Sequence, residues 1–159
     1  MSKKLTKNIK WEINRRISDK PRRIIEKIDS SLISELFSYS SQMNTFTLKQ
    51  FSNINKIPLT VSKNDGNNLI HMIVSSDDET KSEKLRLNVV KFLVSEGVSP
   101  DNPNSDNNTP LHFACTKQHS RIIKYLLEQG ANPNYKDNVG MTPFHYLLAG
   151  NMKLCPPSR

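Results

Sequence analysis

The sequence has no long apolar run, few cysteines and none of the common catalytic motifs, and each absence excludes a class of protein. No apolar run approaches the roughly 18 residues that a helix needs to cross a membrane. The opening stretch MSKKLTKNIKWEINRR lacks the unbroken apolar segment of a secretory signal. The two cysteines, Cys115 and Cys155, lie 40 residues apart outside any C-x-x-C pair. Their spacing favours reduced thiols and a cytoplasmic location over a disulfide framework.

Enzyme signatures are missing as well. There is no glycine-rich phosphate loop, no H-E-x-x-H and no paired-carboxylate motif. Cys115 lies three residues after His112, but a Cys–His nucleophile also needs an oxyanion site. His112 moreover belongs to a repeated motif, described below, that gives it a structural role. We therefore expect no enzyme, no catalytic residue, no cofactor and no metal site.

The positive charge is concentrated at the start of the chain. The 159 residues carry a net charge of +8, and residues 1–27 hold ten Lys or Arg against three acidic residues, which is +7. The remaining residues therefore carry only +1. The length suits one domain preceded by an arm, which we place at residues 1–28.

Within this arm, apolar residues recur every four positions, as one stripe of a helix with Lys and Arg over much of the remaining surface. The stripe consists of Leu5, Ile9, Ile13 and Ile17. Three interpretations stay open. The stripe docks on the first repeat or on a partner protein, or the basic face binds phosphates of a nucleic acid or a localisation receptor. In the third, the arm lies on an anionic membrane surface, although Trp11 lies off the stripe and weakens that interpretation.

A tetrapeptide that returns after 33 residues organises the rest of the chain. Its two copies are Thr109-Pro110-Leu111-His112 and Thr142-Pro143-Phe144-His145. The same shift places KFLVSEGVSP (91–100) over KYLLEQGANP (124–133) and Asn107 over Gly140. A period in this range indicates stacked supersecondary units.

Each element of the repeat predicts a local structure. The threonine is a helix N-cap, and the proline after it occupies the first helical position, where a missing N–H is harmless. We expect a helix at 110–117, with Leu111 and Phe144 pointing into the stack. The next helix carries apolar residues at a 3–4 spacing, and Gly97 and Gly130 each end a helix in a left-handed conformation. These apolar residues are Ile122, Ile123, Leu126 and Leu127, and polar loops follow at 98–108 and 131–141.

The segment from Thr109 to Asn134 resembles an ankyrin repeat, including Ala114, His119 and the Gly130-Ala131 pair. The resemblance implies an all-α solenoid of about three to four stacked helix-turn-helix units at residues 29–150, with a tail at 151–159.

Weaker copies flank the clear one. Residues 65–74 keep Gly66 and His71, but His71 precedes His112 by 41 residues. The surplus lies at 75–86, which we expect to be a solvated loop. Further elements are an inner helix at 29–42, an outer helix plus loop at 48–66, and an inner helix at 142–149 followed by Gly150. No outer helix is predicted after it, so either the chain is a piece of a longer protein or something else covers that face.

The three repeat histidines, His71, His112 and His145, are expected to lie in a row, because stacked units separate them. We expect a buried imidazole bonded to the threonine hydroxyl and to a neighbouring loop backbone, and not a zinc site. His119, in the turn between helices, is expected to be structural as well.

The resemblance implies a protein partner bound through the concave side of the stack. Loop-tip candidates are Asn104, Ser105, Asp106, Lys136, Asn138 and Met141. Inner-helix candidates are Phe113, Thr116, Lys117 and Tyr146, and Tyr135 is a possible aromatic anchor. The alternative function is binding of nucleic acid or an anionic surface by residues 1–27, with the repeats as a mount.

Overall fold

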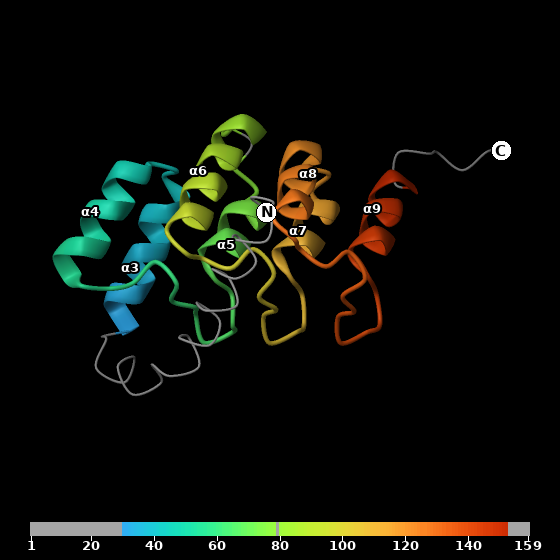
Figure 1. Cartoon of the computed structure of the whole chain (residues 1–159), viewed down its shortest axis with the longest axis horizontal. Coiled ribbons are helices and arrows are strands. Elements are labelled where there is room, and N and C mark those ends of the chain that lie inside the picture. The colour runs from blue at the N-terminus through green and yellow to red at the C-terminus, as the bar shows by residue number, and fades with distance from the viewer. Residues whose placement is uncertain (1–29, 79, 153–159) are drawn as a thin grey trace, which may run out of the picture.

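The structure, a computed structural model, describes residues 30–78 and 80–152 (Figure 1). These residues form seven α-helices, and their only β feature is an isolated bridge between Ser62 and Asn68. The predictions for the arm 1–28, its apolar stripe and Cys155 lie outside the described residues.

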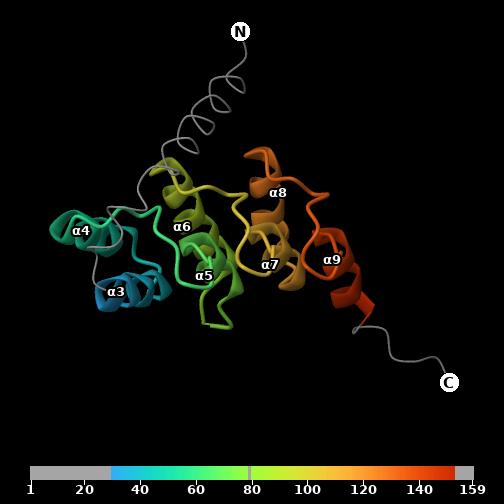
Figure 2. The same ribbon diagram turned by 90° about the horizontal axis from the view of Figure 1, so that it is seen from below.

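The helices alternate between two rows, an inner row and an outer row (Figures 1 and 2). Each outer helix contacts the inner helix that precedes it, and neighbouring inner helices contact one another. This arrangement is the expected all-α solenoid. The inner row is α3 (Ser30–Ser41), α5 (Leu69–Ser75), α7 (Pro110–Thr116) and α9 (Pro143–Met152), and the outer row is α4 (Thr45–Asn55), α6 (Glu83–Ser95) and α8 (Ser120–Glu128).

Helix starts follow the polar residues that precede them. The Asn44 side chain accepts the N–H groups of Phe46 and Thr47 at the start of α4, and Asn68 does the same job for α5. Thr109 is the N-cap of α7, and Pro110 occupies the first turn, as predicted. The two asparagine side chains satisfy N–H groups that have no partner within the helix, whereas the Thr109 hydroxyl lies 3.0 Å from His112 Nδ1.

Outer helices end in a left-handed residue, as the sequence predicts. Gly97 and Gly130 have φ of 101° and 93°, and Lys56 takes the homologous place after α4 with φ of 53°. Gly150 differs from the prediction because it lies inside α9 and does not end it. A Cβ atom at Gly150 would lie 2.6 Å from the Gln118 side-chain nitrogen, so glycine leaves room for that side chain.

The core lies between the two rows of helices. One residue that was predicted to belong to it is exposed. Leu111 is 1% exposed, but Phe144, the homologous residue of α9, is 60% exposed. The prediction that Phe144 points into the stack is therefore wrong. Leu111 is buried because α8 and α9 both pack against α7, whereas no outer helix covers α9 within the described residues. Leu127 and Leu148 are exposed at the same end.

The eight surplus residues of the second unit divide between a loop and a helix. The connection before α6 is residues 76–82, against 117–119 before α8, and α6 has 13 residues against 9 in α8. The insertion therefore lengthens the connection by four residues and adds about one helical turn at the start of α6.

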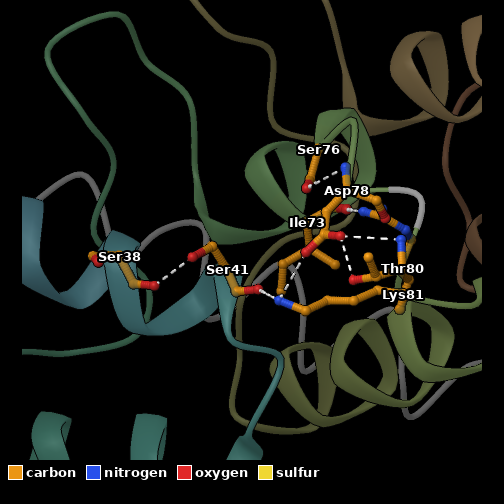
Figure 3. A network of polar contacts seen from close by, with 8 residues as sticks. Ser38, Ser41, Ile73, Ser76, Asp78, Thr80 and Lys81 are labelled. Atoms are coloured by element: carbon orange, nitrogen blue, oxygen red, sulfur yellow. Dashed lines mark hydrogen bonds and ion pairs between the residues drawn. The ribbon is translucent and has the colours of Figure 1, made fainter.

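Side chains of residues 75–86 contact the unit before them and the unit after them. The expectation that this segment is a solvated loop is therefore wrong. Lys81 donates to the Ser41 carbonyl at the end of α3 and pairs with Asp78 at 3.2 Å (Figure 3). Asp77 pairs with Lys117, directly after α7. The Glu83 carboxylate accepts the backbone N–H of Arg121 at 2.6 Å, which places an anion at the N-terminus of α8.

Arg86, on the added turn, is the buried member of this segment. It is 3% exposed, and its guanidinium donates to the Ile73 carbonyl at 2.7 Å and the Asp78 carbonyl at 2.6 Å. Arg86 thus satisfies the carbonyl of a residue near the end of α5 and fixes the path of the connection.

Candidate functional site

Three five-residue turns between the units project from the same side of the stack (Figure 1). In each turn the first residue's N–H donates to the carbonyl of the fifth at 2.9 Å, and the fourth residue has a positive φ. The turns are 63–67, 104–108 and 137–141, with Gly66, Asn107 and Gly140 at φ of 78°, 60° and 81°.

Backbone hydrogen bonds tie each turn to the next. Ser105 N–H donates to the Asp65 carbonyl at 2.9 Å, and Asn138 N–H donates to the Asp106 carbonyl at 3.1 Å. A Cβ atom at Gly66 would lie 2.9 Å from the Ser105 nitrogen, so this approach requires glycine. The loop tips therefore form one hydrogen-bonded row with a fixed spacing.

The repeat histidines join neighbouring units. His112 Nδ1 accepts the Thr109 N–H and lies 3.0 Å from the Thr109 hydroxyl, while Nε2 contacts the Met141 carbonyl at 3.3 Å. His71 repeats this geometry with Asn68 and with the Asn108 carbonyl, 3.1 Å from Nε2. The expected bonding of a buried imidazole to the cap residue and the next loop is confirmed for His112 and, with Asn68 in place of threonine, for His71. For His145 the expected burial is wrong, because this histidine is exposed.

Burial keeps these imidazoles neutral. Desolvation lowers the pKa of His71 from 6.5 to about 4 and also lowers the pKa of His112. With Nδ1 accepting a backbone N–H, the neutral tautomer carries its proton on Nε2 and donates it to the loop carbonyl. His145 also has its Nδ1 at Thr142, 2.7 Å from the hydroxyl, but it is exposed.

Two aromatic rings lie beside these histidines on the inner helices. Phe113 of α7 meets the His71 ring edge-on at 5.7 Å, and Tyr146 of α9 meets the His112 ring at 5.8 Å. Both rings are half-buried, so one side of each is packed and the other faces solvent. Edge-to-face contacts of this kind hold an aromatic ring in one orientation.

Tyr146 also connects the inner helices to the loop tips. Its hydroxyl donates to the Asp137 carboxylate at 2.5 Å, and this hydrogen bond raises the pKa of Tyr146. The other Asp137 oxygen accepts the N–H groups of Val139 and Met141 within turn 137–141. We call the three turns and the solvent-facing sides of α5, α7 and α9 the inner face.

The predicted loop-tip residues take different positions on this face. Ser105, Asp106, Lys136 and Asn138 are exposed, whereas Met141 and Tyr135 are half-buried. Asn104 is 8% exposed, and its side-chain oxygen accepts the N–H groups of Asp106 and Asn108, so its amide stabilises turn 104–108.

The predicted inner-helix residues lie on α7 and α9, except Lys117, which directly follows α7. Thr116 is exposed and bonds to the His112 carbonyl of its own helix, and Lys117 is held by Asp77. One position was missed. Met72 of α5 directly follows His71, as Phe113 and Tyr146 follow their histidines, and it is half-buried as well. Its constant offset from the histidine is the signal that identifies it.

No helix within residues 30–78 and 80–152 is long and apolar enough to cross a membrane. The same residues contain no group of three His, Cys, Asp or Glu side chains placed to hold a metal ion. Burial raises the pKa of the Cys115 thiol to about 11, which makes it a poor nucleophile at neutral pH.

These features define a class of protein, a helical repeat solenoid whose inner helices and loop tips form one hydrogen-bonded surface. The sequence matches the family model described as ankyrin repeats (3 copies) over residues 36–137 and 80–155. The chain therefore belongs to the ankyrin-repeat family, whose repeats are generally protein–protein interaction modules and typically non-enzymatic. No curated protein matches the chain.

Proposed function

We propose that this chain is a non-enzymatic adaptor that binds a protein partner inside the cell through the inner face. The observation that carries the proposal is the pair of half-buried rings, Phe113 and Tyr146, held edge-on against histidines of the preceding units. Aromatic side chains that are already packed on one side lose little freedom on binding and commonly dominate interface energies.

The loop tips complete the surface. Ser105, Asp106 and Asn138 are exposed, and backbone bonds between turns fix their spacing. Thr116 and Lys136 supply further exposed polar groups. A surface with central aromatic rings and a polar, rigid margin has the anatomy of a protein-binding site.

The test uses single charges introduced at exposed positions. Thr116→Glu places a carboxylate on the inner face, and Lys124→Glu does so on the outer row, where the side chain is also exposed. A partner captured from native host cells is expected to bind the Thr116→Glu chain at least about tenfold more weakly, and the Lys124→Glu chain unchanged.

Circular dichroism establishes that both variants keep their helices. Loss of binding in Lys124→Glu, with Thr116→Glu still binding, would reject the inner face. A second pair, Phe113→Ala and Tyr146→Ala, tests the two rings directly.

The second candidate function rests on the charge of +7 in residues 1–27. Such a segment attracts nucleic-acid phosphates or an anionic membrane surface, and its affinity falls steeply with salt. Deleting residues 1–27 is expected to abolish a salt-sensitive affinity for duplex DNA, RNA or anionic vesicles. If the full chain has no such affinity in low salt, this candidate is rejected.

A further inference from the structure

The outward stripe of the first outer helix differs from those of the other two. Each outer helix has three positions, four residues apart, on the side away from the inner row. Equivalent positions in the three helices are those at the same distance before the left-handed residue, which is Lys56, Gly97 or Gly130. In α6 and α8 these are Leu87, Lys91 and Ser95, and Ser120, Lys124 and Glu128, of which all but the half-buried Leu87 are exposed.

In α4 the same positions hold two large apolar side chains. Phe46 is 66% exposed and Ile54 is 77% exposed, with Gln50 between them. Ile54 lies eight positions after Phe46, which is about 12 Å along a helix. We call Phe46, Gln50 and Ile54 the α4 stripe.

We propose that the apolar stripe of the N-terminal arm, Leu5 to Ile17, docks on the α4 stripe of the same chain. Both stripes have a spacing of four residues, and rows of this spacing on two helices interdigitate in the commonest mode of helix packing. Ile17 lies twelve positions after Leu5, about 18 Å along a helix, so the arm stripe is long enough to cover the α4 stripe.

The position of the arm in the chain favours this occupant. Because α3 and α4 are antiparallel neighbours joined by residues 42–44, the start of α3 at Ser30 lies near the end of α4 that carries Ile54. Residues 18–29 span up to about 40 Å when extended, so the arm reaches α4 without strain. An attached segment also has an effective concentration in the millimolar range.

Charge distinguishes α4 from the other outer helices. The α4 stripe has no charged residue, whereas the α6 stripe carries Lys91, which repels an arm of charge +7. The α8 stripe carries Lys124 and Glu128, and an apolar side that docked there would desolvate both charges. Docking through its apolar side leaves the Lys and Arg side chains of the arm facing solvent.

Disulfide pairing tests the site with matched controls. In a Cys155→Ser background, Ile13→Cys is combined in turn with Gln50→Cys, Lys91→Cys or Lys124→Cys, which place a thiol at the same position of the three outer helices. Cys115 is buried and its thiol pKa is about 11, so it does not compete. Under mild oxidation the Gln50 pair is expected to close within one chain at least about tenfold faster than the other two.

Equal rates for the three pairs would overturn the proposal. Cross-links that form only between chains, with a rate that rises with protein concentration, would assign the stripe to a second copy and overturn it too.

Limited digestion with trypsin provides a second test, because the arm contains ten Lys or Arg. Replacing Phe46 and Ile54 by serine is expected to speed cleavage within residues 1–27 several-fold, whereas Val139→Ser, at an exposed residue of turn 137–141, leaves it unchanged. Both α4 residues are exposed, so the double variant keeps its fold, and thermal unfolding followed by circular dichroism checks this. Unchanged cleavage in the double variant would contradict docking on α4.

Discussion

Acidification is expected to destabilise the fold through His71. This imidazole is 1% exposed, and burial lowers its pKa from 6.5 to about 4. As the pH falls below 6.5, the unfolded chain binds a proton at His71 while the folded chain does not. The stabilisation from neutral His71 is therefore complete above pH 6.5 and is lost progressively as the pH falls toward 4.

The size of the effect follows from the shift in pKa. A difference of about 2.5 units corresponds to about 3 kcal/mol of unfolding free energy across the window. A domain of this size has a total stability of about 5 to 15 kcal/mol, so one imidazole accounts for a large share of it. His112 adds to the loss in the same direction, because burial lowers its pKa also.

Urea denaturation followed by circular dichroism, at several values between about pH 7.5 and about pH 4.5, measures this profile. The wild-type chain is compared with His71→Gln, which is less stable at neutral pH but is expected to lose about 2.5 kcal/mol less between about pH 7.5 and about pH 4.5, because the full effect is reached only below about pH 4. The matched control is His145→Gln, because His145 occupies the same repeat position but is exposed.

Two results would refute the argument. One is a His71→Gln profile as steep as that of the wild type. The other is an NMR titration in which the His71 ring protons of the folded chain change near pH 6.5, because a buried neutral imidazole does not titrate there.

The remaining predictions concern stability and are measured by urea denaturation at neutral pH. Glu83→Ala is expected to cost about 0.5–2 kcal/mol because the start of α8 loses its carboxylate acceptor; no change would mean that the α8 N–H groups have other partners. Gly66→Ala is expected to cost more than Gly140→Ala: both residues have positive φ, but only Gly66 has a neighbouring backbone atom within 3 Å of the added Cβ, and equal costs would contradict the contact. Leu111→Ala is expected to cost about 2–5 kcal/mol and Phe144→Ala less than about 1 kcal/mol, and similar losses would show that α9 is covered in solution.

Much of the inner face was predictable from spacing. The bonding of His71 and His112 to the cap residue and the next loop follows from the repeat, because the same residue at the same offset meets the same neighbours in each unit. Repetition also places Phe113 and Tyr146 each against the histidine of the preceding unit. The contribution of Asn104 was not predictable, because its residue type suits both an exposed tip and a turn-stabilising amide.

The contacts of the added turn of α6 could not be predicted from sequence patterns. Residues 75–86 are rich in charge, and a charged segment predicts exposure. Arg86 is nevertheless buried, because two carbonyls near the end of α5 accept its guanidinium hydrogen bonds. Glu83 reaches α8, whose first residue follows it by 37 positions. No pattern among the neighbouring residues in the sequence indicates either contact.

The sequence by itself determined the elements that depend on neighbouring residues: the cap and proline that begin α7, the glycines that end the outer helices, and the period of the units. These depend on backbone conformation within a few residues, which side-chain type controls directly. Only the tertiary structure decided which repeat positions are covered. Leu111 and Phe144 occupy the same place in the repeat, yet one is buried and the other exposed, because burial depends on the segment packed above a residue and not on the residue itself.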